Sequence, residues 1–219
     1  MSGKLIVLEG IDGAGKSTLA KALMAYLEKT GRTVRTLVYP EKTGRKVQML
    51  IYPDRSYIYG KIIDDFLHSK INLSVEEQFL LYLIDMVKDK VKIANALADD
   101  EIIILDRYFF STVAYQCSNG LDYERSKKFI ELLSLNRPFG VFYIDLSVEL
   151  SLQRKQKQKS LIGVDRFEKN KALLQSARSF YERLLSERAF ADNWVRIDGS
   201  KSQEEVSKNL INEAEKLGL

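Results

Sequence analysis

The chain has 219 residues, of which 45% are apolar and 29% charged, with a net charge of +4. This length suits one α/β core, so we expect a single domain, residues 1–219, with small insertions. The mild basic excess disfavours a nucleic-acid partner, and no apolar stretch reaches the roughly 18 residues of a membrane span. One cysteine, Cys117, and one histidine, His68, allow neither an internal disulfide nor a zinc cluster, and we expect a cytoplasmic protein.

The first elements predict a strand–helix–strand unit. Lys4–Leu8 is a continuous apolar run, typical of a strand buried on both faces. Apolar residues recur at helical spacing from Gly15 to about Thr30, and Thr33–Val38 has the pattern of a second strand. The stretch between Tyr39 and Leu73 is less regular and predicts an insertion with short helical pieces. These pieces cover Arg45–Tyr52 and Tyr57–His68.

Strands and helices continue to alternate towards the C-terminus. A capping box at Ser74 opens a long helix that runs to about Leu97, and a second box opens the last helix at Ser202. The later strands cover Ile102–Leu105, Val141–Ile144 and Trp194–Ile197, and the helices cover Phe110–Gln116, Glu124–Leu135, Glu149–Arg154 and Phe167–Arg188. Five apolar strands alternating with helices predict an α/β fold, a three-layer α/β/α sandwich around a five-stranded parallel sheet. Ligands are then expected at the carboxyl ends of the strands.

The strongest motif lies between the first strand and the first helix. Gly10–Ser17 matches G-x-x-x-x-G-K-[ST], in the strand–helix context that confirms a P-loop. Its backbone N–H groups curl round a phosphate; Lys16 should reach the β/γ-phosphates and Ser17 should bind Mg²⁺. The residues expected to bind ATP here are Gly10, Asp12, Gly13, Ala14, Gly15, Lys16, Ser17 and Thr18.

Two charged residues follow the strand Ile102–Leu105. Asp106 has the position of a Walker-B acid that holds magnesium, although such an acid is often only a turn cap. Arg107 could clamp a second phosphate or form a surface ion pair. The absence of an N-K-x-D motif disfavours a GTPase switch. A second phosphate site would distinguish a kinase from other P-loop proteins, and its candidates are Lys42, Arg107 and the basic run Lys155–Ser160.

At this point the chain resembles the thymidylate kinase family of nucleoside monophosphate kinases over nearly its whole length. The matching segments are Glu9–Thr18 (the P-loop), Tyr39-Pro40-Glu41-Lys42 (F-P-x-R), Asp106-Arg107-Tyr108 (D-R-[YH]), Ser111–Gln116 (S-x-x-A-Y-Q), Tyr143–Arg154 (Y-L-D-x…L-x-R) and Asp165–Glu168 (D-R-F-E). The resemblance implies an ATP- and Mg²⁺-dependent kinase that phosphorylates thymidine monophosphate (dTMP) to dTDP, and a homodimer.

The resemblance also implies an acceptor site. In it, Asp12 contacts the deoxyribose, Lys42 and Arg107 hold the acceptor phosphate, and Tyr82 stacks on the base. The remaining acceptor-site residues are Tyr39, Pro40, Met86, Ser111, Tyr115 and Gln116. Arg154 and the loop Asp198–Ser200 are implied on the ATP side.

Three departures from the family pattern matter. Lys42 replaces an arginine, so a bidentate fork becomes a point charge. Met86 replaces the arginine of F-x-x-x-R and cannot donate to the base carbonyl; Lys88 or Lys90 could substitute, while Tyr82 and Met86 could also be plain helix core.

The third departure is Gly13, which places the chain among family members with a basic lid, here about residues 155–166. Its cations, Lys155, Lys157, Lys159 and Arg166, are candidates for stabilising the transferring phosphoryl group, although this stretch could also be a solvated charged face. The alternatives left open are a kinase for another nucleotide, such as dUMP or CMP/UMP, a nucleoside kinase and a nucleotide-binding switch.

Overall fold

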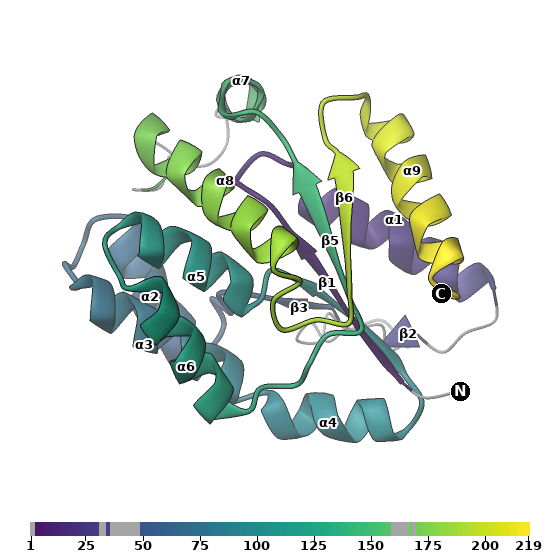
Figure 1. The fold of residues 1–219 in the computed structure, drawn as a ribbon, viewed down its shortest axis with the longest axis horizontal. Coiled ribbons are helices and arrows are strands. Elements are labelled where there is room, and N and C mark those ends of the chain that lie inside the picture. The colour runs from purple at the N-terminus through teal and green to yellow at the C-terminus, as the bar shows by residue number, and fades with distance from the viewer. Residues whose placement is uncertain (1–2, 31–33, 36–48, 159–166, 168–169) are drawn as a thin grey trace.

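The computed structural model describes residues 3–30, 34–35, 49–158, 167 and 170–219, which form a parallel sheet between two layers of helices (Figure 1). The strands are β1 (Lys4–Glu9), β2 (Val34–Arg35), β3 (Leu50–Ile51), β4 (Ile102–Asp106), β5 (Gly140–Asp145) and β6 (Asn193–Asp198). Their order is β2-β4-β1-β5-β6, and β3 pairs with β4 next to β2, so the sheet has five strand positions. The predicted three-layer fold with a five-stranded parallel sheet is confirmed.

Alternating side chains of the central strands divide the core into two halves. On β1, Leu5 and Val7 face one half, whereas Ile6 and Leu8 face the other. The first half packs under α3 (Val75–Val87), α5 (Phe109–Ser118) and α8 (Lys171–Ser186), and the second under α1 (Lys16–Lys29) and α9 (Gln203–Lys216). Strands buried on both faces explain the continuous apolar runs of the sequence.

Several element boundaries differ from the prediction. The expected helix from Ser74 to about Leu97 is two helices, α3 and α4 (Lys90–Ala98), because Asp89 N–H bonds the Met86 carbonyl in a tight i→i−3 turn. The helix predicted over Arg45–Tyr52 is wrong at Leu50–Ile51, which is β3. The remaining helices are α2 (Ile58–Leu67), α6 (Tyr123–Leu133) and α7 (Val148–Gln158), the last longer than predicted.

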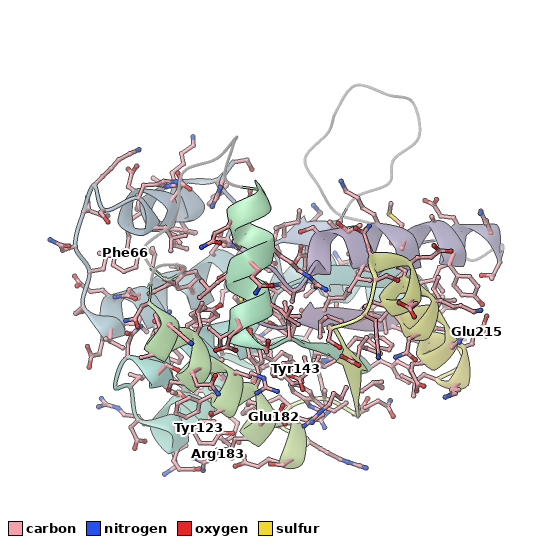
Figure 2. The ribbon with its side chains drawn as sticks, turned by 90° about the horizontal axis from the view of Figure 1, so that it is seen from above. Phe66, Tyr123, Tyr143, Glu182, Arg183 and Glu215 are labelled. Carbon is pink, nitrogen blue, oxygen red and sulfur yellow. The ribbon has the colours of Figure 1, made fainter. Side chains whose placement is uncertain are left out.

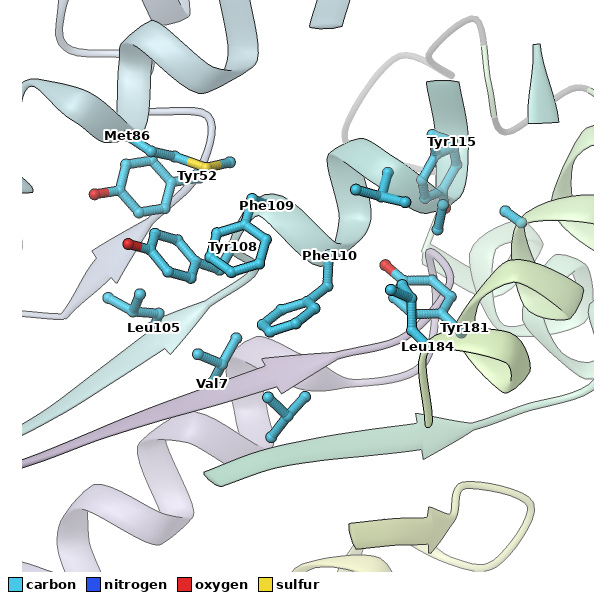
Figure 3. Close-up of a cluster of buried hydrophobic side chains, with 14 of the residues drawn as sticks. Val7, Tyr52, Met86, Leu105, Tyr108, Phe109, Phe110, Tyr115, Tyr181 and Leu184 are labelled. Atoms are coloured by element: carbon cyan, nitrogen blue, oxygen red, sulfur yellow. The ribbon is translucent and has the colours of Figure 1, made fainter. Parts of the chain in front are cut away.

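A row of aromatic rings joins the end of β3 to α5 (Figure 3). The rings of Tyr52 and Tyr108 are 6.2 Å apart, those of Tyr108 and Phe109 4.5 Å, and those of Phe109 and Phe110 4.4 Å. Aromatic pairs at such distances contribute beyond the area that they bury. The segment after β3 is therefore anchored to the start of α5.

Charged residues join α6 to α8 on the outer surface, where Tyr123 and Arg183 lie next to each other (Figure 2). The Arg183 guanidinium is 3.7 Å from the Tyr123 ring centroid, and Glu187 accepts hydrogen bonds from Tyr123, Lys127 and Arg183. Burial would raise the pKa of Glu187, but these hydrogen bonds lower it from 4.5 to about 2. Among the described helices, none combines the length and the hydropathy needed to cross a membrane.

Candidate active site

A cavity of about 640 Å³ opens at the carboxyl ends of β1, β3 and β4. Its volume is in the range of small-molecule sites. One end is lined by the P-loop and by charged side chains, and the other by apolar and aromatic ones. The lining includes Asp12, Gly13, Gly15, Lys16, Ser17, Thr18, Arg55, Tyr82, Met86, Asp106, Arg107, Ser111, Tyr115, Gln116 and Lys155.

The P-loop is held in place by the start of α7. The Ser151 hydroxyl donates to the Asp12 carbonyl oxygen at 2.6 Å, and a Cβ at Gly13 would lie 2.9 Å from the Ser151 carbonyl oxygen. Gly13 also has φ +78°, a conformation that favours glycine. The Lys16 ammonium donates to the carbonyl oxygens of Gly10 and Ile11, both at 3.0 Å. Burial and the neighbouring Arg107 guanidinium lower the pKa of Lys16 to about 8.

Ser17 and Asp106 lie together, as the sequence predicted. The register of β1 and β4 pairs Asp106 with Leu8, so this acid leaves the sheet beside the P-loop. The Ser17 hydroxyl donates a hydrogen bond to the Asp106 carboxylate. A hydroxyl and a carboxylate are hard oxygen ligands, which suit Mg²⁺ bound mainly through water and phosphate oxygens. The donor set therefore fits the expected metal.

Asp12, Arg107 and Tyr115 form a charged group at the floor of the cavity. The Arg107 guanidinium donates to the Asp12 carboxylate and, at 3.2 Å, to the Gly10 carbonyl oxygen, and the Tyr115 hydroxyl donates to Asp12 at 2.9 Å. Burial alone would raise the pKa of Asp12, but the Arg107 and Lys16 charges hold it well below its usual range. Arg107 is therefore beside the P-loop, with one edge fixed by Asp12.

Glu9 sits behind this group and is fully buried. Its carboxylate accepts from the Tyr108 N–H at 2.7 Å, the Ser111 N–H at 3.3 Å and the Tyr181 hydroxyl at 2.9 Å. Burial raises the pKa of Glu9, against the effect of Arg107. These bonds tie the first turn of α5 to β1 and so fix the backbone next to Arg107, whose φ is +72°.

The sequence prediction missed a turn that forms one wall of the cavity, Tyr52–Ser56. The Tyr52 N–H donates to the Asp106 carbonyl oxygen at 3.2 Å, so the turn leaves β3 beside the Walker-B acid. Arg55 lines the cavity, and its side chain, 56% exposed, pairs with Asp64 at 3.0 Å. A Cβ at Gly60 would lie only 1.9 Å from the Asp54 carbonyl oxygen, so glycine lets α2 approach this turn.

A signal for this turn was present in the sequence. Tyr52-Pro53-Asp54-Arg55 repeats the order of residue types found in Tyr39-Pro40-Glu41-Lys42, with arginine in the last position. The F-P-x-R pattern therefore fits the second run better than the first.

The other end of the cavity is apolar, with Tyr82 and Met86 on its wall. Met86 is 2% exposed and belongs to the core, so the interpretation as helix core holds for this residue, and its contact to a base stays a prediction. Gln116, 1% exposed, lines the same cavity, and its side-chain oxygen has no hydrogen-bond partner among the described residues. Such a buried acceptor is costly unless a ligand or water satisfies it.

Neither Lys88 nor Lys90 substitutes for the family arginine whose position Met86 occupies. The Lys88 ammonium donates to the Asp85 carbonyl oxygen at 2.8 Å and to the Asp89 carboxylate at 2.7 Å, and the Lys90 ammonium donates to the Leu133 carbonyl oxygen at 2.9 Å. Neither residue lines the cavity.

Several predicted residues lie elsewhere. Arg154 donates to the carbonyl oxygens of Gly199 at 2.8 Å and Lys201 at 3.2 Å, which ties α7 to the loop after β6. Lys155 is the lid cation that lines the cavity among the described residues. The positions outside the described residues are Tyr39, Pro40, Lys42, Lys159 and Arg166, together with the side chain of Lys157.

Comparison with known proteins gives one consistent result. The family model for thymidylate kinase matches residues 8–210. A thymidylate kinase of Leptospira interrogans is 36% identical over 211 residues, which cover 94% of this chain and 91% of that protein. One of Brachyspira hyodysenteriae is 33% identical over 220 residues, covering 97% and 93%. A probable thymidylate kinase of Archaeoglobus fulgidus is 30% identical over 207 residues, covering 94% and 92%. The chain therefore belongs to the thymidylate kinase family.

Proposed function

We propose that this protein transfers the γ-phosphoryl group of ATP to dTMP, giving dTDP and ADP. The observation that carries the proposal is one cavity that joins a P-loop, the two arginines Arg55 and Arg107, and an apolar, aromatic end. A phosphoryl donor, an acceptor phosphate and a nucleobase each have a matching surface there. Family membership supports the same reaction.

ATP takes the P-loop side in this proposal. Backbone N–H groups of Gly10–Thr18 surround its phosphates, and Lys16 exchanges its carbonyl partners for phosphate oxygens. Ser17 and Asp106 would hold Mg²⁺, which neutralises phosphate charge. Arg154 and the loop it fixes, near Gly199, form the adenine side.

The acceptor phosphate lies between Arg107 and Arg55. Both guanidiniums line the cavity, and planar forks of this kind bind phosphate bidentately. We therefore assign to Arg55 the role that the sequence first suggested for Lys42. Asp12, which already accepts from the Tyr115 hydroxyl, is a suitable acceptor for a deoxyribose hydroxyl.

The base occupies the apolar end. Tyr82 and Phe167 supply ring surface, Met86 supplies apolar contact, and the Gln116 amide, whose oxygen has no partner among the described residues, reads the base edge. A carboxamide both donates and accepts hydrogen bonds, which suits the N3–H and adjacent carbonyl of thymine.

Positioning and charge neutralisation are sufficient for the chemistry. The acceptor phosphate is largely ionised near neutral pH, so a strong general base is not required. Lys16, Arg107 and the lid cations Lys155, Lys157 and Lys159 offset the charge on the transferring group, and closure of the lid about residues 155–166 excludes water.

We also propose that the protein works as a homodimer in the cytoplasm. Leu80 and Ile84 are exposed four residues apart on α3, and Ile58 and Ile62 are exposed at the same spacing on the neighbouring α2. Exposed apolar stripes on adjacent helices mark interaction surfaces. Ile84→Asp should shift the mass measured by light scattering from dimer to monomer; an unchanged mass would reject this surface.

The deciding experiment is a panel of ribo- and deoxyribonucleoside monophosphates with ATP and Mg²⁺. We expect ADP release that depends on the acceptor and is fastest with dTMP. Faster turnover of dUMP, CMP or UMP would reassign the acceptor. ATP binding without any acceptor-dependent ADP release would instead indicate a nucleotide-binding switch.

A further inference from the structure

A cluster of buried and partly buried charges lies behind the turn Tyr52–Ser56, where α3 ends. The Lys88 ammonium is 3.3 Å from the Asp54 carboxylate, 3.1 Å from that of Asp85 and 2.7 Å from that of Asp89. The Asp85 side chain is 0% exposed and that of Lys88 11%. One ammonium thus holds three carboxylates that would otherwise repel each other in a poorly solvated space.

The cluster holds the turn from both sides of Arg55. On one side, the Tyr52 hydroxyl donates to Asp89 at 3.1 Å and the Lys88 ammonium lies 5.2 Å from the Tyr52 ring. Directly before Arg55, the Asp54 N–H donates to Asp85 at 2.8 Å. The ammonium also lies 5.6 Å from the ring of Tyr57, two residues after Arg55.

Lys88 does not face the substrate itself. Its ammonium has three donors, and they are directed at the Asp85 carbonyl oxygen and at the surrounding carboxylates. The residue does not line the cavity, whereas Asp54 and Arg55, which it holds in place, do.

We propose that Lys88 is a positioning residue that fixes the turn carrying Arg55 in its acceptor-binding arrangement. It acts through Asp54 and Asp85, and the proposal rests on the function assigned to the cavity above. In this proposal Lys88 itself makes no contact to the acceptor. It determines where the Arg55 backbone lies, and through it where the guanidinium can reach the phosphate.

The test compares Lys88→Met with Lys90→Met, a matched control two residues away whose ammonium donates to the Leu133 carbonyl oxygen and does not contact the turn in the described part of the chain. Displacing a binding group by about 1 Å can cost up to roughly a hundredfold, so we expect K88M to raise the acceptor KM by about tenfold or more. The ATP KM should change by less than about twofold, since the P-loop is untouched. K90M should leave both constants unchanged.

Two further variants separate positioning from stability. Lys88→Arg keeps the charge, so its acceptor KM should be close to that of the wild type. If K88M does not fold, the double variant K88M/D89N takes its place, because it removes one of the unbalanced carboxylates and keeps an acceptor for the Tyr52 hydroxyl. Against D89N alone, the double variant should still show the raised acceptor KM.

An unchanged acceptor KM in folded K88M or K88M/D89N overturns the proposal, as does an equal rise in the two KM values. The wild-type panel and Arg55→Met distinguish the possible failures. If the wild type phosphorylates dTMP and R55M weakens acceptor binding while K88M does not, only the role of Lys88 is rejected. If the wild type phosphorylates no nucleotide, the proposed function itself is wrong.

Discussion

Replacing Arg55 by methionine is the sharpest test of the acceptor site. A hydrogen bond to a charged group contributes about 1.5–3 kcal/mol. Binding a phosphate would cost Arg55 its pair with Asp64, at 3.0 Å and with the arginine 56% exposed, and such surface pairs contribute only about 0–1 kcal/mol. The difference of about 1–2 kcal/mol predicts an acceptor KM raised by about five- to thirtyfold.

The assay is steady-state ADP release with dTMP varied at saturating ATP, and then with ATP varied. R55M should raise the dTMP KM and leave the ATP KM within about twofold, because Arg55 is on the acceptor wall and outside the P-loop. Lys42→Met is the matched control and should have the smaller effect. A dTMP KM that rises in K42M and not in R55M would refute the assignment of the acceptor phosphate to the turn Tyr52–Ser56.

Three other predictions test separate parts of the structure. Lys16→Ala and Arg107→Ala should each lower kcat by about a hundredfold or more with little change in thermal melting, and unchanged turnover would remove that residue from the site. Met86→Arg adds a donor that favours the 4-oxo group of thymine and repels the 4-amino group of cytosine, so the kcat/KM ratio of dTMP to dCMP should rise about tenfold; a constant ratio would place the base elsewhere. Because the pKa of Glu187 is depressed to about 2, its pairs stabilise the fold above about pH 4.5 and that contribution is lost as the pH falls towards 2. After allowance for solvent screening, Glu187→Gln should remove about 1 kcal/mol of stability at pH 7 in urea unfolding and flatten the acid dependence; an equal acid dependence in both proteins would contradict this.

Local patterns were sufficient to predict most of the fold. Each central strand is a run of apolar residues because both faces of the sheet are covered. Such a strand can be predicted from its own residues, without knowing which strands lie beside it. Strand β3 gave no such signal, since Leu50–Ile51 is extended only through its pairing with Leu105 and Asp106, far away in the sequence. The break between α3 and α4 was also missed, because the backbone turn that forms it, with the Asp89 N–H bonded to the Met86 carbonyl oxygen, does not alter the spacing of apolar residues.

The candidate site divides in the same way. Gly10–Ser17, Asp106 and Arg107 were predictable because each belongs to a motif fixed by its position after a strand. The proposed acceptor turn was missed, because the chain contains two Tyr-Pro-acid-cation runs and the first of them was matched to the family segment. The family pattern, which ends in arginine, favours Arg55 over Lys42, and this choice required no coordinates.

The hydrogen-bond and ion-pair partners of a cation indicate whether it binds substrate or supports the site, which its charge alone does not show. Lys16 bonds backbone carbonyls, and Arg55, whose own side chain is 56% exposed, forms an ion pair with Asp64. A phosphate can replace these partners with little loss because water or neighbouring backbone remains at hand. Lys88 is enclosed by three carboxylates, one of them fully buried, and removing it from them would leave unpaired charges away from solvent. Lys16 and Arg55 can therefore give up their present partners for a phosphate, whereas Lys88 cannot do so without a large cost in free energy. A lysine close to a phosphate site is thus better explained as part of its framework when its partners are buried acids.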